Sequence, residues 1–285
     1  MTAPLSRLDH VIIAVRDLEA GAKTFTRLGF RLTPLGLHEG KGTGNRCVMF
    51  QDSYVELLGI VDQKEAKGRL GELIASRGEG GIGVAFGADD ADEAAAAIKD
   101  EGLAVEPPQD LARPLDLDGK RETVRFRNVM LPGLQPKVLI QFVCVHVTPE
   151  LTRARHEWQL HANGADGLSE VVIHADDPAT LRADYAKLFG EAAIREAAHG
   201  FVVRLANLGL AVMTRVGLQE RFGPHAADGG PTVPCVAALS VRVKEIDAAG
   251  AILDMAGVDF KETPHGLIVP AKKAHGMVVE FVSSH

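Results

Sequence analysis

The chain has 285 residues, of which 46% are hydrophobic and 24% charged, a composition typical of a globular protein with a substantial core. A formal net charge of −7 without a basic stripe argues against a nucleic-acid partner, and no apolar run is long enough to span a membrane. No secretory signal is visible and the three cysteines are far apart, so we expect a reduced, cytoplasmic protein.

The first sixty residues predict one βαβββ module. Residues 8–15 (LDHVIIAV) form an apolar, β-branched segment typical of a strand. Residues 17–28 then show helical spacing of their apolar side chains, with Asp17 suited to begin the helix and Gly29 to end it. Two further strands are predicted after a glycine-rich loop, over residues 47–50 and 54–60.

The same pattern returns three times. The first strand and the helix of each further copy are predicted over residues 81–86 and 91–101, 171–174 and 179–188, and 236–243 and 246–255. The last strand of each copy is predicted over residues 138–145, 210–214 and 277–282. Each copy has Asp or Glu just before its helix and Gly just after it. A single unit of this kind is common, whereas four in a row predict an internal repeat.

A linker separates the second copy from the third. We expect a first domain over residues 1–147, a linker helix over residues 148–167, and a second domain over residues 168–285. The predicted fold class is α+β. The four βαβββ modules form two curved mixed β-sheets with helices packed outside, and the concave face of a sheet is the expected ligand site.

The ends of the first module carry a distinctive pattern. It begins Leu8-Asp9-His10-Val11 and ends Tyr54-Val55-Glu56-Leu57, and it resembles the glyoxalase / vicinal-oxygen-chelate superfamily. The loop His38-x-Gly40-x-Gly42-Thr43-x-Asn45 resembles a bacterial glyoxalase-like branch of it. The resemblance covers nearly the whole chain and implies a glyoxalase-like fold. The superfamily includes isomerases, ring-cleaving dioxygenases, thiol transferases and drug-binding proteins, so fold alone leaves the function open.

The resemblance also implies a divalent metal ion (Zn, Mn, Fe, Ni or Co) held by residues on the first and last strands of two modules. Carried over to this sequence, the first copy supplies His10 and Glu56, and the fourth supplies Glu280. The second copy offers no better donor than Gln141. Pairing of copies one and four would gather His10, Glu56 and Glu280 as metal ligands. Pairing of copies three and four would place Glu170 opposite Glu280 without a histidine. Pairing of copies one and two would leave His10 and Glu56 with Gln141 and His38, and the first half is the preferred site because its loop pattern is the better preserved one.

Glu56 is the most informative of these residues. A carboxylate inside an apolar strand is costly to bury unless it is paired or coordinated, so Glu56 is expected to be a metal ligand or the catalytic base. A structural ion pair is the alternative. His10 has an alternative too, as a cavity or core histidine whose ring nitrogens are satisfied by hydrogen bonds.

The glycine-rich loop is the predicted substrate-binding element. Its backbone amides, together with Lys41 and Arg46, suit a carboxylate or phosphate, and an ordinary mobile loop is the alternative. The predicted substrate-binding residues are His38, Thr43, Asn45 and Arg46. We expect His146 and His161 to make structural contacts with the linker, and Cys144 to be an inert packing residue.

These residues favour a metal-dependent enzyme of the isomerase or lyase type, acting on a small oxygen-rich molecule in the concave sheet. The alternative is a metal-free protein that binds or sequesters a small molecule. Extradiol ring cleavage is less favoured, because Glu170 stands where the first histidine of such a site would be. The expected partner is a small-molecule substrate, and a homodimer in which modules pair across subunits also fits the sequence.

Overall fold

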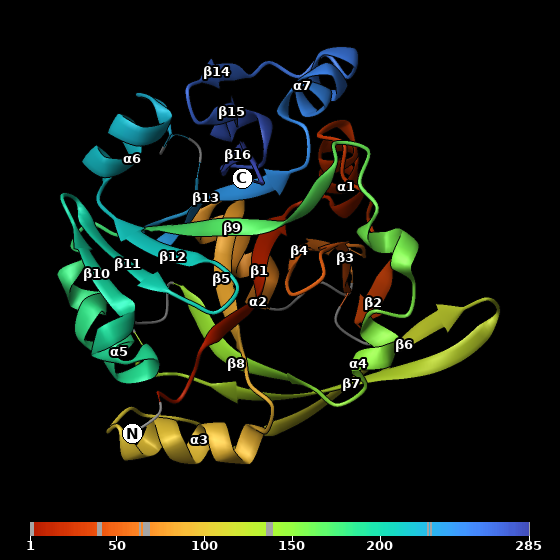
Figure 1. Ribbon diagram of the computed structural model, residues 1–285. Coiled ribbons are helices and arrows are strands. Elements are labelled where there is room, and N and C mark those ends of the chain that lie inside the picture. The colour runs from red at the N-terminus through yellow and green to blue at the C-terminus, as the bar shows by residue number, and fades with distance from the viewer. Residues whose placement is uncertain are drawn as a thin grey trace.

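A computed structural model describes residues 3–38, 42–62, 64, 69–134, 139–226, 228 and 230–284. It contains four βαβββ modules in series, as predicted, with additional short helices between them (Figure 1). No helix within these ranges is long and apolar enough to cross a membrane.

The first two modules form the first half of the molecule. Module 1 contains β1 (Arg7–Val15), α1 (Leu18–Arg27), β2 (Gly36–His38), β3 (Thr43–Met49) and β4 (Tyr54–Ile60). The helix α2 (Arg69–Arg77) follows it. Module 2 contains β5 (Gly80–Gly87), α3 (Ala91–Asp100), β6 (Gln109–Leu117), β7 (Lys120–Met130) and β8 (Ile140–His146). The predicted start of β8, at Val138, lies outside the described residues.

The last two modules form the second half. Module 3 contains β9 (Ala165–His174), α5 (Ala179–Phe189), η2 (Glu191–Ala193), β10 (Ile194–Ala197), β11 (Gly200–Arg204) and β12 (Gly209–Met213). The helix α6 (Arg215–Phe222) joins it to module 4. Module 4 contains β13 (Cys235–Val243), α7 (Ile246–Met255), β14 (Lys261–Thr263), β15 (Gly266–Val269), η3 (Ala271–Lys273) and β16 (Val278–Ser283).

The segment between the halves holds two short turns rather than one helix. These are α4 (Pro149–Thr152) and η1 (His156–Gln159), and β9 begins soon after them. Thr152 and Trp158 are both buried. Their spacing of six residues does not place two side chains on one face of a continuous α-helix, so the chain bends between them to bury both.

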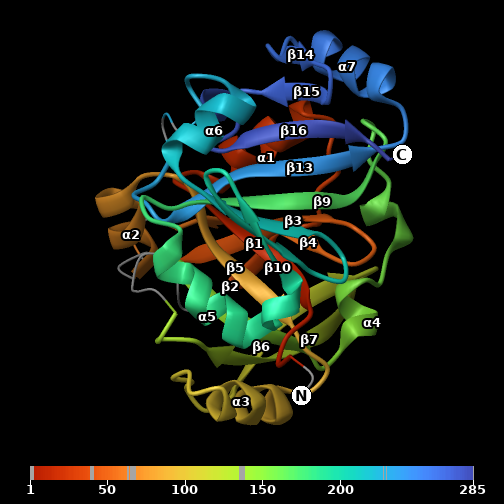
Figure 2. The ribbon, with the colours of Figure 1, turned by 60° about the vertical axis from the view of Figure 1, so that its left-hand side comes forward.

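Modules pair through their first strands. In the first half β1 runs antiparallel to β5, and in the second half β9 runs antiparallel to β13. The last strand of each module lies parallel to its own first strand. One further pair, Val236 with Gly81, joins β13 to β5, so the two curved sheets meet in one continuous mixed sheet (Figure 2).

The predicted helix signals are confirmed in module 1. The Asp17 carboxylate accepts hydrogen bonds from the backbone N–H groups of Glu19 and Ala20, which otherwise have no partner inside the helix. Gly29 ends the helix with a φ of 89°, and a Cβ at this position would lie 2.7 Å from Asn163. Asp17 therefore caps the start of α1, and Gly29 is required for the positive φ and close packing at its end.

The main core lies on the outer face of the sheet and is shared by both halves. Phe25 of α1, Ile98 of α3, Leu188 of α5 and Leu253 of α7 all belong to one buried cluster. Helix α5 of module 3 packs against module 2, where the rings of Tyr185 and Phe86 meet edge to face. The inner, concave face of each half is therefore not part of this main core.

Candidate active site in the first half

The concave face of the first half encloses a cavity of about 290 Å³. Strands of both modules line it, and the edge strand β2 of module 1 approaches β6 of module 2 across its side. Its apolar walls include Met49, Leu115, Phe126, Phe142, Leu151 and Trp158. A cavity of this size is near the lower end for small-molecule sites, and apolar walls with few polar groups are typical of them.

A β-bulge in β1 turns two consecutive polar side chains away from the outer core, and the second of them, His10, lines the cavity. Leu8, Val11 and Ile13 belong to the outer core, so regular alternation is broken between Leu8 and Val11. The pairing of β1 with β5 shifts register at the same place, between Leu8 and His10. The extra residue lets Asp9 and His10 lie side by side, although neighbours in a regular strand point to opposite faces.

Asp9 is shared by two histidines. Its carboxylate accepts hydrogen bonds from Nδ1 of His10 at 2.7 Å and from Nε2 of His146, on β8, at 3.0 Å. The second ring nitrogen of His146 bonds to the hydroxyl of Thr152 at 3.1 Å. Burial alone would raise the pKa of Asp9, but the hydrogen bonds and charges of the two imidazoles hold it well below the usual range. Asp9 is therefore an anion that orients both rings.

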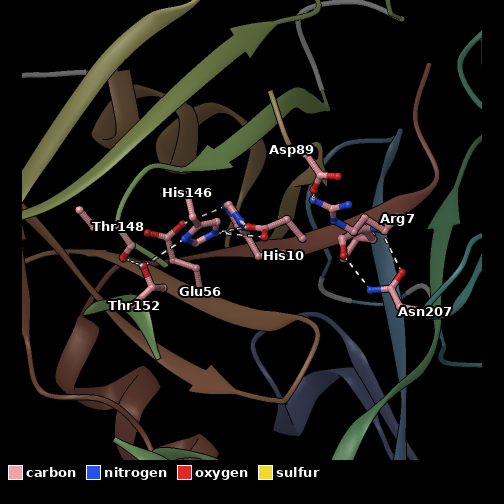
Figure 3. Close-up of polar contacts among 10 residues, drawn as sticks. Arg7, His10, Glu56, Asp89, His146, Thr148, Thr152 and Asn207 are labelled. Carbon is pink, nitrogen blue, oxygen red and sulfur yellow. Dashed lines mark hydrogen bonds and ion pairs between the residues drawn. The ribbon is translucent and has the colours of Figure 1, made fainter. Parts of the chain in front are cut away.

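Glu56 faces the free side of His10. Its Oε2 lies 3.7 Å from Nε2 of His10, while its Oε1 accepts a hydrogen bond from the Asn45 side chain at 2.6 Å. The ring of Tyr54 stacks on that of His10 with centroids 4.4 Å apart. Figure 3 shows His10, His146 and Glu56 gathered at one place from three different strands. One imidazole and one carboxylate are thus both held in fixed orientations at the cavity wall.

The predicted substrate-binding residues separate into two groups. His38 and Asn45 line the cavity, and Thr43 supports His38 through a contact of 3.0 Å between its hydroxyl and Nδ1. Arg46 points away from the cavity and pairs with Glu19 of α1 at 2.8 Å. This follows from the alternation of β3, which places Arg46 on the face opposite to Asn45. Gly40 and Lys41 of the predicted loop lie outside the described residues.

Glu280 does not join His10 and Glu56. It lies on β16 in the second half, where it accepts hydrogen bonds from Ser240 at 2.5 Å and from Arg221 at 3.0 Å. Arg221 also pairs with Glu170. The expectation that copies one and four share a site fails because copy one pairs with copy two, and copy four with copy three, through their first strands.

Gln141 does not join the cavity either. Its side-chain oxygen accepts a hydrogen bond from Tyr185 of α5 at 2.6 Å, so it faces the outer core. The neighbouring positions on β8, Phe142 and Cys144, are the ones that line the cavity. The sequence match between β8 and the last strand of module 1 is accurate to only about one residue. A shift of one residue along a strand moves a side chain to the other face, which explains why the sequence match places Gln141 on the wrong face.

Several residues of the site carry no clear signal in the sequence. Asp9 depends on the bulge, which local alternation does not predict. Cys144 and His146 could have been found together, because their spacing of two residues puts both on one face of β8. Burial, together with the charges of Asp9 and Glu56, raises the pKa of the Cys144 thiol well above its usual value, so it is a neutral thiol here. His146 contacts the linker through Thr152, as predicted, whereas His161 itself lies in the linker and contacts Met49 and Arg31 of module 1.

Two groups of donor atoms in the site could hold a divalent ion, and the pair His10 and Glu56 fits one better than the group Asp9, Cys144 and His146. Two ligands held at about 2.0–2.2 Å from one ion lie roughly 3–4 Å apart, and Nε2 of His10 and Oε2 of Glu56 meet this condition. A carboxylate on the second nitrogen of a metal-binding histidine, as Asp9 is on His10, is the usual outer support. The second arrangement is Asp9, Cys144 and His146, whose donor atoms lie within 4.8 Å of one another. There Asp9 already accepts hydrogen bonds from both imidazoles, so we favour His10 and Glu56.

Comparisons with known proteins address the fold. The profile of a family described as a glyoxalase-like domain matches residues 8–189. A hypothetical protein from Staphylococcus aureus is 13% identical over 97% of this chain and 98% of its own, with a TM-score of 0.68. A mutant of 4-hydroxymandelate synthase from Streptomyces coelicolor is 13% identical over 98% of this chain and 93% of its own, with a TM-score of 0.55.

A shorter likeness covers half of the chain. Methylmalonyl-CoA epimerase from Streptomyces coelicolor is 25% identical over 50% of this chain and 99% of its own, with a TM-score of 0.38. A sequence comparison with curated proteins gave no match. The two full-length likenesses concern the architecture alone, and the chemistry has to be argued from the site.

Proposed function

Because the chain belongs to the glyoxalase-like domain family, we propose that the cavity of the first half is the active site of a metal-dependent enzyme of the isomerase or lyase type. The substrate would be a small oxygen-rich molecule. The observation that carries the proposal is the approach of His10 Nε2 to Glu56 Oε2, at 3.7 Å, on the wall of a cavity of about 290 Å³.

The side chains around this pair support a role as ligands. The Asp9 carboxylate accepts a hydrogen bond from the Nδ1–H group of His10, which leaves Nε2 with its lone pair toward the cavity. Stacking on Tyr54 limits rotation of the same ring. A divalent cation held here would act as a Lewis acid on oxygen atoms of the substrate. Apolar walls exclude water and strengthen each electrostatic interaction in the site.

Glu56 is also placed to move a proton. Asn45 fixes Oε1 and leaves Oε2 directed toward His10 and the cavity. A carboxylate that is held by one oxygen and free at the other can accept a proton from a bound molecule and return it, as isomerase and lyase reactions require. In the proposed function Glu56 is therefore both a ligand candidate and the base.

Elemental analysis tests the proposal. Untagged protein would be measured as purified, and again after stripping and reloading with each of the five candidate metals. We expect near-stoichiometric metal in the wild type and its loss in His10→Ala and Glu56→Ala, because each variant removes one of two protein donors. Glu280→Gln is the matched control and should retain the metal, since Glu280 is bonded to Ser240 and Arg221 in the other half.

The opposite results are equally clear. If folded wild-type protein takes up no metal under any loading condition, the chelate mechanism is wrong. A metal-free protein that binds small molecules then becomes the better description. Loss of metal in Glu280→Gln, with metal retained in His10→Ala and Glu56→Ala, would place the ion in the second half.

A further inference from the structure

The wall of the cavity carries a cation that has no counter-ion among the residues that the structure describes. Arg113, on β6, is half-buried and is the only Arg or Lys among the described residues that line the cavity. No hydrogen bond or ion pair of its side chain to another described residue is present. Two other arginines of the first half differ in this respect, since Arg46 pairs with Glu19 and Arg127 pairs with Asp92. A guanidinium that is partly removed from water is stabilised by an anion, and the described part of the chain does not pair one with Arg113.

The guanidinium lies on the same side of the cavity as Asn45 and Cys47. A Cβ on Gly36 would lie 3.1 Å from Nη1 of Arg113 and 2.4 Å from Oδ1 of Asn45, so glycine leaves room for both groups against the wall. The positive charge also reaches the Cys47 thiol. Burial and the Glu56 charge raise the pKa of that thiol to about 12, and Arg113 opposes the rise. Arg113 and the carboxylate of Glu56 are therefore both close to β3.

A second polar group of the wall lacks a partner. Oδ1 of Asn128, on β7, is buried in the lining of the cavity and accepts no hydrogen bond from the described residues. Asn128 lies beside Cys144 in the pairing of β7 with β8, and Cys144 is close to Asp9 and His146. Unsatisfied buried groups are rare in folded proteins, so a bound molecule that donates a hydrogen bond would explain this one.

We propose that Arg113 is the subsite for the carboxylate of a small substrate with an apolar body, and that Asn128 accepts a hydrogen bond from a hydroxyl or amine of the same molecule. The planar guanidinium fork matches a carboxylate through two parallel hydrogen bonds. A doubly charged phosphate would call for a second cation, and the described lining has Glu56 instead. The inference rests on the proposed function only in taking this cavity as the substrate site, and it does not require the metal.

A tryptophan in the cavity allows a direct test. Trp158 is the single tryptophan of the chain and lines the cavity, so its fluorescence reports on occupancy. Metal-stripped full-length protein would be titrated with phenylacetate, with phenylacetamide of nearly the same shape, and with phenyl phosphate. We expect phenylacetate to bind about tenfold more tightly than the amide, as expected for one charge-assisted contact. Phenyl phosphate should bind no better than phenylacetate.

The variants assign this preference to one residue. Arg113→Gln should abolish the preference of the protein for the acid over the amide, and Arg113→Lys should retain part of it, because Lys keeps the charge without the fork. Arg46→Gln is the matched control. It removes the same charge from the same half outside the cavity, and should leave the preference intact. Thermal unfolding of each variant would show that the fold is retained.

Three results would overturn the subsite. They are equal binding of acid and amide to the wild type, no binding of the acid, and an equal loss of preference in Arg46→Gln and Arg113→Gln. None of them bears on metal content, which is measured separately on the His10 and Glu56 variants. An enzyme without this subsite would hold metal but show no preference for the acid. A metal-free binding protein with this subsite would prefer the acid but hold no metal.

Discussion

At the scale of single residues, the decisive feature is one carboxylate shared by two imidazoles. Asp9 accepts from His10 at 2.7 Å and from His146 at 3.0 Å. A buried anion without partners would be costly, and here each partner comes from a different module. The charge on Asp9 therefore sets the orientation of His10 and links β1 to β8 at the floor of the site.

We predict that Asp9→Asn weakens metal binding about 10- to 100-fold, the usual effect of removing the outer support of a ligand. The neutral amide of Asn lacks the negative charge that strengthens the hydrogen bonds from both rings, so it holds the ring of His10 less firmly. Metal affinity would be measured by competition with a chelator. Asp17→Asn is the control, because Asn caps α1 as well as Asp does. Unchanged affinity in Asp9→Asn would remove Asp9 from the site.

At the scale of elements, the concave face of the second half is covered by a helix, whereas that of the first half encloses a cavity. In the second half, Leu218 and Phe222 of α6 pack into a buried cluster with Val172 and Ala238 of the sheet. Arg221 of the same helix bridges Glu170 and Glu280. Helix α6 thus places an apolar face and a cation where the first half has an open cavity.

We predict that Arg221→Ala destabilises the protein by about 1–3 kcal/mol, because it leaves the buried carboxylate of Glu280 with Ser240 as its only described partner. Urea unfolding at neutral pH would measure the change in the free energy of unfolding. Arg182→Ala is the control. Arg182 bridges Glu191 and Glu196 on the surface, and its loss should cost clearly less. A cost no greater than that of Arg182→Ala would show that the bridge does not hold α6 in place.

At the scale of the whole molecule, buried and half-buried histidines join segments that are distant in the sequence. His161 connects the linker to Met49 of β3 and to Arg31. His275, near the end of the chain, contacts Thr24 of α1. Burial lowers the pKa of His161, of His174 and of His275 below the usual value for histidine.

We predict that these histidines destabilise the protein as the pH falls below about 6.5. Each has a folded-state pKa below its unfolded value, so its contribution is fully present above the unfolded pKa. It is lost at lower pH because the unfolded chain binds more protons. Urea midpoints at about pH 7.5, 6.5 and 5.5 would show the loss. His161→Gln should flatten this pH dependence, whereas His225→Gln, at an exposed position, should not. Equal slopes for wild type and His161→Gln would contradict the assignment.

The sequence by itself determined the features that depend on neighbours in the chain. The four βαβββ modules follow from strand alternation and helical spacing, and Asp17 and Gly29 mark the ends of α1 through capping and a positive φ. The resemblance to the glyoxalase superfamily implied His10 and Glu56 as residues of one site and the loop as its neighbour, and His10, Glu56, His38 and Asn45 all line the same cavity.

Only the tertiary structure decided which modules face each other and which polar residues meet. Pairing of first strands separates Glu280 from His10, and the hairpin of β6 and β7 brings Arg113 into the cavity where Arg46 was expected. The bulge at Asp9 reverses local alternation, since it depends on the register with β5. Such contacts form between strands far apart in the chain, and their geometry is set by edge pairing and packing rather than by the residues next to them.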